Sequence, residues 1–299
     1  IIAEGLAAPA GITTNSSRTL YFSEVPTPDL SGDEGGENTV KKLDLRSGNM
    51  TTLSEGEPYP LNLALDRYGN VYWTCNTAGV ILKYSRRGGE KSVFLPQGLV
   101  PGESDPEGFE FLMKPSGITV DRAGDVLWTE VPNPGNFDGG NLVNVADKDG
   151  NISLSPISEF EPAPTDIVIS WDGSAYWTCN TAGVIVRRSP GGVVSIFKGG
   201  LEYPTGIALN RLGTKLYYTE IPTPGLFGPG FPVEDQGGRN KVVELDLKTG
   251  ETHTVAYGYP LPQDVAVAPN GNIYWTCSTA GVIACAKPQQ EKRRYYWRW

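Results

Sequence analysis

The sequence predicts an all-β fold, a single six-bladed β-propeller made of three tandem two-blade units, and two repeated motifs carry this prediction. The decapeptide YWTCNTAGVI at 72–81 recurs unchanged at 176–185 and, with one substitution, at 274–283. A second motif alternates with it: YFSEVPTP at 21–28, LWTEVPNPG at 127–135 and YYTEIPTPG at 217–225. Six alternating units of about 50 residues match the period of a propeller, in which each blade is one four-stranded sheet.

Within a unit, short apolar segments separated by Gly and Asn turns indicate four antiparallel strands. In the second unit we expect these strands at 61–65, 71–75, 80–84 and 92–95. No unit has apolar residues at helical spacing, which excludes a helical solenoid of similar period. Composition agrees, because the 299 residues include 37 Gly and 24 Pro but only two Met.

The ends of the repeat region predict how the ring closes. Residues 1–6 resemble residues 195–201, an outer fourth strand, whereas the sixth unit stops after a third strand at 282–286. We therefore expect the N-terminal strand to complete the last blade, which removes an exposed sheet edge. The propeller then spans 1–288, and 289–299 form a basic, aromatic tail that is either loose or strapped over the propeller.

Charge and hydropathy exclude two classes of partner. The net charge of −9 disfavours nucleic acid, whose phosphates require a basic surface. No apolar run reaches the roughly 18 residues of a membrane span. The chain begins at Ile1 rather than Met, and glycosylation sequons at Asn15, Asn49 and Asn151 lie in turn-like sequence. We therefore expect a secreted glycoprotein. With nucleic acid and membrane disfavoured, we expect its partner to be a small organic molecule.

Alignment of the units brings polar residues to one end of the central channel. The second strands end at Glu24, Cys75, Glu130, Cys179, Glu220 and Cys277, and the first strands begin near Gly11, Asn62, Gly117, Asp166, Gly206 and Asp264. Clustered carboxylates raise each other's pKa unless a cation neutralises them, and oxygen ligands suit Ca²⁺ or Mg²⁺. The same side chains can instead cap backbone N–H groups, a role that a repeat copies into every unit. Both interpretations stay open.

Other residues at this end are candidates for substrate binding. Asn76 and Asn180 follow two of the cysteines, and Phe137, Phe227 and Phe231 lie in Pro- and Gly-rich loops that follow the glutamates. Because alternate blades hold the repeated cysteines too far apart for a disulfide, we expect free thiols, either nucleophilic or simply buried.

The distribution of histidine excludes several hydrolase mechanisms. The one histidine, His253, falls on an outer fourth strand, so neither a Cys–His pair nor a Ser–His–Asp triad can form at the channel. The sequence also contains no G-x-S-x-G, H-E-x-x-H or Walker motif.

Two family resemblances rest on these residues. The YWT tripeptide resembles the YWTD propellers of lipoprotein-receptor ectodomains, with Cys75, Cys179 and Cys277 replacing that family's structural aspartate. The six-blade layout of 1–288 is similar to the superfamily of senescence-marker-protein/gluconolactonase, paraoxonase and strictosidine-synthase propellers. That resemblance implies a channel metal, for which the matching positions here are Asn62, Asp166, Asp264 and a glutamate from 24, 130 or 220.

The alternation of TE-[VI]-P-x-P with YWTC also resembles propellers of fungal secondary metabolism, some of the hetero-Diels–Alderase type. This resemblance implies non-hydrolytic ring formation by cycloaddition, with the strand-end Glu, Cys or Thr groups polarising a carbonyl. Such a reaction needs orientation and hydrogen-bond donors rather than a nucleophile. The alternatives are a divalent-metal-dependent lactonase or esterase, and a binding propeller without catalysis.

Overall fold

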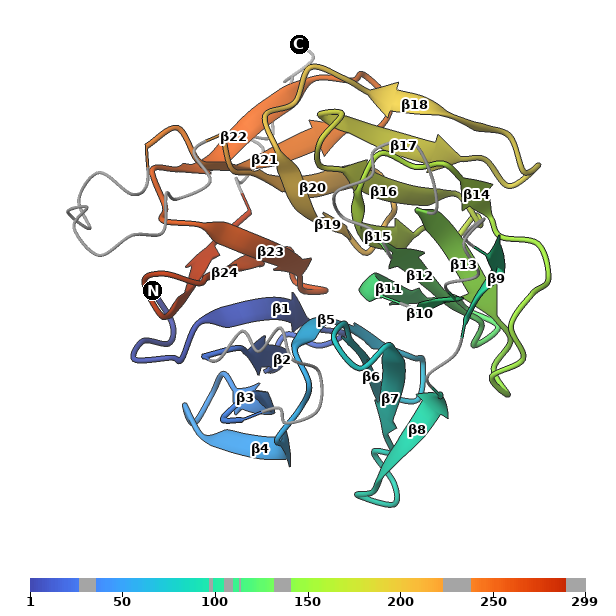
Figure 1. Ribbon diagram of the computed structural model, residues 1–299. Helices are drawn as coiled ribbons and strands as arrows, with labels where there is room; N and C mark the ends of the chain where they lie inside the picture. Colours follow the sequence, from blue (N-terminus) through green and yellow to red (C-terminus); the bar gives the residue numbers. More distant parts are fainter. Residues whose placement is uncertain are drawn as a thin grey trace, which may run out of the picture.

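The computed structural model consists of small antiparallel sheets arranged around one axis, as Figure 1 shows. It describes residues 1–26, 36–96, 99–104, 110–112, 114–131, 141–222 and 238–288. In these residues every regular element is a strand, and no helix suited to crossing a membrane occurs among them. The predicted six-bladed propeller is thus confirmed.

The blades follow one another along the chain. Blade 1 comprises β1 (Pro9–Thr13), β2 (Thr19–Glu24), β3 (Thr39–Asp44) and β4 (Met50–Glu55); blade 2 comprises β5 (Pro60–Leu65), β6 (Val71–Cys75), β7 (Val80–Tyr84) and β8 (Lys91–Leu95). Blade 3 comprises β11 (Pro115–Val120), β12 (Val126–Glu130), β13 (Leu142–Ala146) and β14 (Ser158–Glu159); blade 4 comprises β15 (Pro164–Ile169), β16 (Ala175–Cys179), β17 (Val184–Arg188) and β18 (Val194–Lys198). Blade 5 comprises β19 (Pro204–Leu209), β20 (Lys215–Glu220), β21 (Lys241–Asp246) and β22 (Thr252–Tyr257); blade 6 has β23 (Pro262–Val267), β24 (Ile273–Cys277) and β25 (Val282–Ala286). A separate hairpin, β9 (Leu99–Ser104) and β10 (Glu110–Leu112), stands between blades 2 and 3 in the sequence.

The N-terminal residues complete blade 6, as predicted. Ala3 pairs antiparallel with Ile283, and the Leu6 N–H donates to the Gly281 carbonyl at 2.9 Å. Leu201 donates to Gly183 in the same way, also at 2.9 Å, at the end of the outer strand of blade 4. The first residues therefore occupy the place of a fourth strand, although they form a single bridge rather than a regular ladder.

The alternation of Gly with Asn or Asp in the first strands has a steric cause. Each first strand has a bulge at this position, and the first strands of neighbouring blades pack closely there. A Cβ on Gly206 would lie 2.5 Å from the Asp264 Cα, and one on Gly117 would lie 2.4 Å from the Asp166 Cα. Two neighbouring blades therefore cannot both carry a side chain at this level, so every polar residue faces a glycine.

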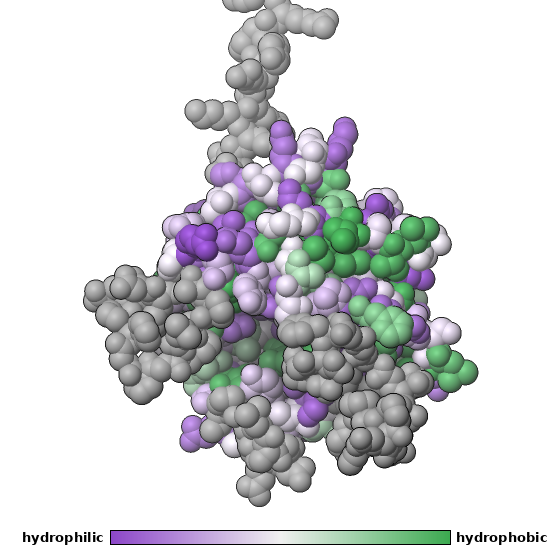
Figure 2. Space-filling model, turned by 45° about the horizontal axis from the view of Figure 1, so that its top comes forward, coloured by the Kyte–Doolittle hydropathy of each residue, from purple (hydrophilic) through white to green (hydrophobic). Residues whose placement is uncertain are grey.

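The core lies between the blades. The repeated tryptophans of the second strands are at most 1% exposed and pack against neighbouring blades, as their repetition predicts; they are Trp73, Trp128, Trp177 and Trp275. On the outside, apolar and polar side chains are interspersed on the face shown in Figure 2.

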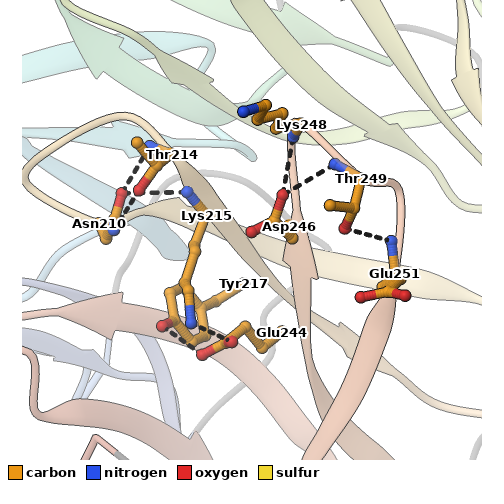
Figure 3. Close-up of polar contacts among 9 residues, drawn as sticks. All are labelled: Asn210, Thr214, Lys215, Tyr217, Glu244, Asp246, Lys248, Thr249 and Glu251. Carbon is orange, nitrogen blue, oxygen red and sulfur yellow. Dashed lines mark hydrogen bonds and ion pairs between the residues drawn. The ribbon is translucent and has the colours of Figure 1, made fainter. Parts of the chain in front are cut away.

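Turn residues of blade 5, drawn in Figure 3, illustrate why the strands end where they do. The Asn210 Oδ1 accepts the Thr214 N–H at 2.9 Å, and the Asp246 carboxylate accepts the Lys248 and Thr249 N–H groups. These side chains satisfy backbone donors that the ladders leave free.

Candidate functional site

Two aspartates and an asparagine from three alternate blades meet on the propeller axis. Asp166 and Asp264 are 5% exposed. Each carboxylate accepts two backbone N–H groups, one from the residue that follows it in the chain and one from the next blade. The partners in the next blades are Ile207 for Asp166, at 2.8 Å, and Ile12 for Asp264, at 2.7 Å. The side chains of Asn62 and Asp264 both lie close enough to Asp166 to shift the pKa of its carboxyl. The structure thus brings together the three residues that the alignment placed at the first strands.

Burial raises the pKa values of this axial carboxyl pair, Asp166 and Asp264, above those of ordinary carboxyl groups. Desolvation raises the pKa of Asp166 to about 7, against the effect of its N–H partners. Desolvation, followed by the charge of Asp166, raises the pKa of Asp264 well above its ordinary value. Both shifts favour retention of a proton by the pair as the pH rises toward neutrality, so the two carboxyls resist carrying two charges together.

Hydroxyl groups of the second strands support these bulges, and the sequence reasoning missed them. The Thr178 Oγ1 accepts the Asp166 N–H at 3.2 Å and donates to the Thr205 carbonyl of the next blade at 2.6 Å. Thr74 and Thr276 repeat both contacts. The conserved T of the YWTC copies is the signal for this role, since a buried hydroxyl inside a strand requires a partner.

The residues on the axis do not match a divalent-cation site. No three Asp, Glu, His or Cys side chains of the described residues lie close enough together to hold a metal ion. All four oxygens of Asp166 and Asp264 already accept N–H groups, and Ca²⁺ takes six to eight oxygen ligands. Binding of Ca²⁺ or Mg²⁺ by Asn62, Asp166 and Asp264 stays an untested prediction.

A pocket of about 770 Å³ opens at the end of the channel where the second strands end and the first strands begin. We call it the mouth pocket. Its described walls come from blades 6, 1 and 2 and are mainly apolar: Leu6, Ala7, Ala8, Ala10, Val25, Pro26, Leu61, Leu261 and Ala280, with Tyr59, Gln263, Ser278, Thr279 and Gly281. No described group hydrogen-bonds to the side chains of Gln263 and Ser278, so both can bind a ligand.

The backbone around the mouth pocket is held in an uncommon conformation. Ala8, Tyr59 and Leu261 precede the prolines that start first strands, and their φ angles of 50°, 56° and 48° lie in the left-handed region. Their carbonyls accept the N–H groups that follow the second strands, Ser278 to Leu261 at 3.2 Å for example. The pocket wall is therefore built from residues whose strain the surrounding sheets maintain.

Glu24 and Glu220 lie elsewhere than expected. Both are at most 3% exposed and line no part of the mouth pocket. Glu24 pairs with Lys41, and Glu220 lies 3.4 Å from the Lys241 ammonium. Both also accept N–H groups from the loop before their own blade, which is the capping role that the sequence left open.

The repeated cysteines are likewise sealed inside their blades. Cys75, Cys179 and Cys277 are 0% exposed, and all four cysteines are free thiols, as predicted. The Cys179 Sγ lies 3.3 Å from Glu161, and the Cys75 Sγ lies 3.6 Å from Glu57. Burial raises the pKa of every one of these thiols, that of Cys277 to about 12, so none is a thiolate near neutral pH.

Glu57 and Glu161 are buried carboxylates that the alignment missed. Each accepts the indole N–H of its blade's tryptophan, Trp73 at 3.1 Å and Trp177 at 3.0 Å. Glu57 and Glu161 lie just before the first strands of blades 2 and 4, whereas Glu24 ends the second strand of blade 1. Their carboxylates nevertheless occupy the place in the blade that the Glu24 carboxylate occupies in blade 1. The repeated S-E-x-E-P sequence at 54–58 and 158–162 is the signal that would have found them.

Glu130 differs from the other strand-end glutamates. It is 0% exposed, and neither carboxylate oxygen has a hydrogen-bond partner among the described residues. Burial raises the pKa of Glu130 to about 8; the nearby Trp128 indole and Lys114 N–H groups lower it only in part. This side chain is therefore mainly a neutral acid at pH 7 when nothing neutralises its charge.

The remaining predicted residues fall in several places. Asn76 lies beside the mouth and donates its amide to the Pro115 carbonyl at 3.2 Å, and Asn180 occupies the matching place in blade 4. The sequon residues Asn15, Asn49 and Asn151 are exposed, on loops at the opposite end of the blades. His253 lies on β22, as expected. Phe137, Phe227, Phe231 and the tail 289–299 lie outside the described residues.

Comparison with known proteins supports the fold. No model of a known protein family and no curated protein matches the chain. A solved streptogramin B lyase is 20% identical, over 95% of this chain and 84% of its own, with a TM-score of 0.60. A catalytically inactive His-to-Ala variant of virginiamycin B lyase from Staphylococcus aureus, with quinupristin, is 18% identical over 97% and 87%, with a TM-score of 0.57. A protein described as a candidate gluconolactonase is 13% identical over 93% and 88%, with a TM-score of 0.63.

These identities show the fold and no more. The chain is a six-bladed β-propeller, and its structural neighbours lie among the gluconolactonase-like and virginiamycin B lyase propellers and so include enzymes. None of these neighbours is similar enough in sequence to lend its reaction to this chain.

Proposed function

We propose that this propeller is a small-molecule enzyme whose mouth pocket promotes non-hydrolytic ring formation, of the hetero-Diels–Alder type. In this reaction a heterodiene and an alkene join through two new σ bonds at the expense of two π bonds. No atom leaves and no oxidant is required, so the enzyme needs to orient two apolar partners and stabilise charge on one heteroatom.

The observation that carries the proposal is the makeup of the mouth pocket. Aliphatic residues make up most of its lining although nearly half of its exposed surface is polar, its volume suits two small reactants, and its side-chain donors are Tyr59, Gln263, Ser278 and Thr279. The buried thiols and the distant His253 supply no nucleophile–base pair at this place. Gln263, which no described group binds, is suited to donate to the heterodiene oxygen as its electron density rises.

The test uses an ortho-quinone methide generated in situ and a simple terpene alkene. The uncatalysed reaction gives a racemic adduct, so an enantiomeric excess reports catalysis directly. Leu61→Trp should abolish the excess by filling the pocket, whereas Leu212→Trp, on a turn where Leu212 is 70% exposed, should preserve it. A racemic product from the unmodified protein across a panel of such pairs would argue against the proposal.

A metal-dependent lactonase is the second candidate, although the axial residues Asn62, Asp166 and Asp264 do not match a divalent-cation site. The neighbour described as a candidate gluconolactonase supports it at the level of fold. Hydrolysis of a small lactone that stops on chelation and returns with Ca²⁺ would establish this function and displace the cycloaddition. Saturable ligand binding without turnover in either assay would indicate a binding propeller.

A further inference from the structure

Carboxylates join the first strands of neighbouring blades at two places beside the axis. At the junction of blades 4 and 5, Asp166 accepts the backbone N–H groups of Ile167 and Ile207, both at 2.8 Å. At the junction of blades 6 and 1, Asp264 makes the same two contacts, both at 2.7 Å. In each case one buried carboxylate occupies the place toward which two N–H groups from adjacent blades point.

The junction of blades 2 and 3 has the same pair of N–H groups but a different side chain. Asn62 stands where the other two junctions have an aspartate, and the equivalent N–H groups are those of Leu63 and Ile118. No described residue accepts either N–H group. Leu63 is 5% exposed and Ile118 3%, and a backbone N–H in such a place requires an acceptor.

Strand pairing sets the direction of these two N–H groups. In blade 2 the Asp66 N–H donates to the Asn70 carbonyl, and hydrogen-bonded pairs alternate with non-hydrogen-bonded pairs along the strand. Leu63, three residues before Asp66, is therefore in a non-hydrogen-bonded pair, so its N–H points away from β6 and toward the axis. Counting back three residues from the matching turn contact of Asp121 gives the same direction for Ile118 in blade 3.

The Asn62 amide does not lie where the two carboxylates lie. The Asp264 Oδ1 is 2.6 Å from the position of a Cβ built on Gly206 in the preceding blade. For Gly11, which precedes Asn62 in the same way, the three nearest atoms include none from the Asn62 side chain beyond its Cα. Asn62 is also half-buried, whereas both aspartates are 5% exposed. The amide has therefore turned away from the two N–H groups.

A cavity of about 170 Å³ adjoins this junction, and we call it the axial well. The first strands of all six blades line it, from the residues of the aspartate level onward, so it lies on the far side of the aspartates from the mouth pocket. Leu63, Ile118 and Asp166 contribute to its wall, which is otherwise mainly aliphatic. A cavity of roughly 150 Å³ accommodates benzene, so the axial well suits a molecule of about six heavy atoms.

We propose that the axial well binds a short aliphatic carboxylic acid, whose carboxyl group takes at blades 2 and 3 the place that an aspartate takes at the other two junctions. One carboxyl oxygen accepts the Leu63 N–H and the other accepts the Ile118 N–H, as the two oxygens of Asp166 accept theirs. The alkyl chain packs against the aliphatic wall of the well. A carboxyl group offers two acceptor oxygens, whereas an alcohol of the same length offers one.

The charge of the surroundings decides in which form the acid enters. Asp166 and Asp264 are the titratable side chains among the described residues that line the axial well. Because like charges oppose each other, the acid binds more readily with its proton than as an anion. A test at about pH 5, where a measurable part of a simple carboxylic acid is still protonated, therefore favours binding.

The test is a titration with butyrate carrying ¹³C in its carboxyl group, at pH 5 and constant ionic strength, followed by NMR. We expect saturable binding with a Kd on the order of 1 mM, as befits a ligand of this size. Butanol, which has the same chain and a single oxygen, should displace the labelled butyrate at least tenfold less effectively than unlabelled butyrate does.

Asn62→Asp supplies the carboxylate from the chain itself, so it should weaken butyrate binding at least tenfold. Asn49→Asp makes the same change at an exposed position in blade 1 and should leave binding unaltered. The proposal is overturned if the unmodified protein shows no saturable binding, if butanol competes as well as butyrate, or if folded Asn62→Asp keeps full affinity. The butanol comparison uses the unmodified protein, so it decides the matter even if Asn62→Asp does not fold.

Discussion

At the scale of single residues, environment rather than residue type decides what each carboxyl group does. Glu24 and Glu130 end equivalent second strands, yet Glu24 contacts a lysine and Glu130 has no described partner. Asp166 and Asp264 share a proton on the axis. The equivalent residue of blade 2 is Asn62, whose side chain is an amide. An aspartate that holds a proton and an asparagine have similar shapes and both can donate, so this axial position accepts either residue.

The axial carboxyl pair predicts a pH dependence of stability. Its pKa values are higher in the folded state than in the unfolded chain, so its contribution to stability is complete below about pH 4 and is lost as the pH rises through about 7. Between these two values stability should fall by up to about 1.4 kcal/mol per pH unit, and the decline should level off above about pH 7. Asp166→Asn should flatten this decline, as measured by urea midpoints at pH 5 and pH 7. An unchanged decline in that variant would mean that other groups cause it.

The buried hydroxyls predict a second effect at this scale. Thr178→Val keeps the side-chain shape but leaves the Asp166 N–H and the Thr205 carbonyl without their partner. We expect a loss of about 2–4 kcal/mol in the free energy of unfolding. Thr252→Val, at an exposed position on β22, is the matched control and should change stability by less than about 0.5 kcal/mol. Similar losses in the two variants would contradict the proposed role of Thr178.

At the scale of elements, the sequence predicts strands well because their signals are local. The strands of blade 2 begin and end within one residue of the predicted ranges, since two-residue alternation and Gly or Asn turns specify them. The direction of the strand-end side chains was not predictable in the same way. Glu24 and Cys75 turn into their blades toward Lys41 and Glu57, and these contacts depend on residues 17 and 18 positions away.

Close packing of the first strands makes a sharp prediction for one glycine. In Gly206→Ala the new Cβ would meet the Asp264 backbone at 2.5 Å, which neither strand can relieve without breaking the bulge. We expect destabilisation of about 3 kcal/mol or more, seen as a lower denaturant midpoint. Gly191→Ala is the control, because its Cβ meets nothing closer than 3.9 Å. A Gly206→Ala protein as stable as the control would show that the first strands are not packed this tightly.

At the scale of the whole molecule, closure of the ring rests on few contacts. Ala3 and Leu6 are buried against the last blade, and the Asp264 carboxylate bonds to the Ile12 N–H across the junction between blades 6 and 1. Deletion of residues 1–6 should therefore expose the β25 edge and lower Tm by several degrees, with aggregation on heating. Deletion of 1–2 alone, where Ile1 is 68% exposed, should have a smaller effect. Equal behaviour of the two deletions would place the closure elsewhere.

The repeat accounts for the ring, but it does not by itself reveal the pocket. Every unit contributes an equivalent strand end, so the alignment treats the six blades alike. The mouth pocket lies instead at blades 6, 1 and 2, where the small side chains of Ala7, Ala8 and Ala10 form part of its wall. Side-chain volume across a curved junction is a property of the assembled molecule, which is why it was not predictable from any single unit.

The most direct test of the claim that function resides in the mouth pocket is a crystal structure of the protein soaked with planar aromatic ketones. The expected result is density between Leu61 and Leu261, with the ketone oxygen within hydrogen-bond distance of Gln263. Ketones bound reproducibly at the opposite end of the channel, with none in the mouth pocket, would contradict this account.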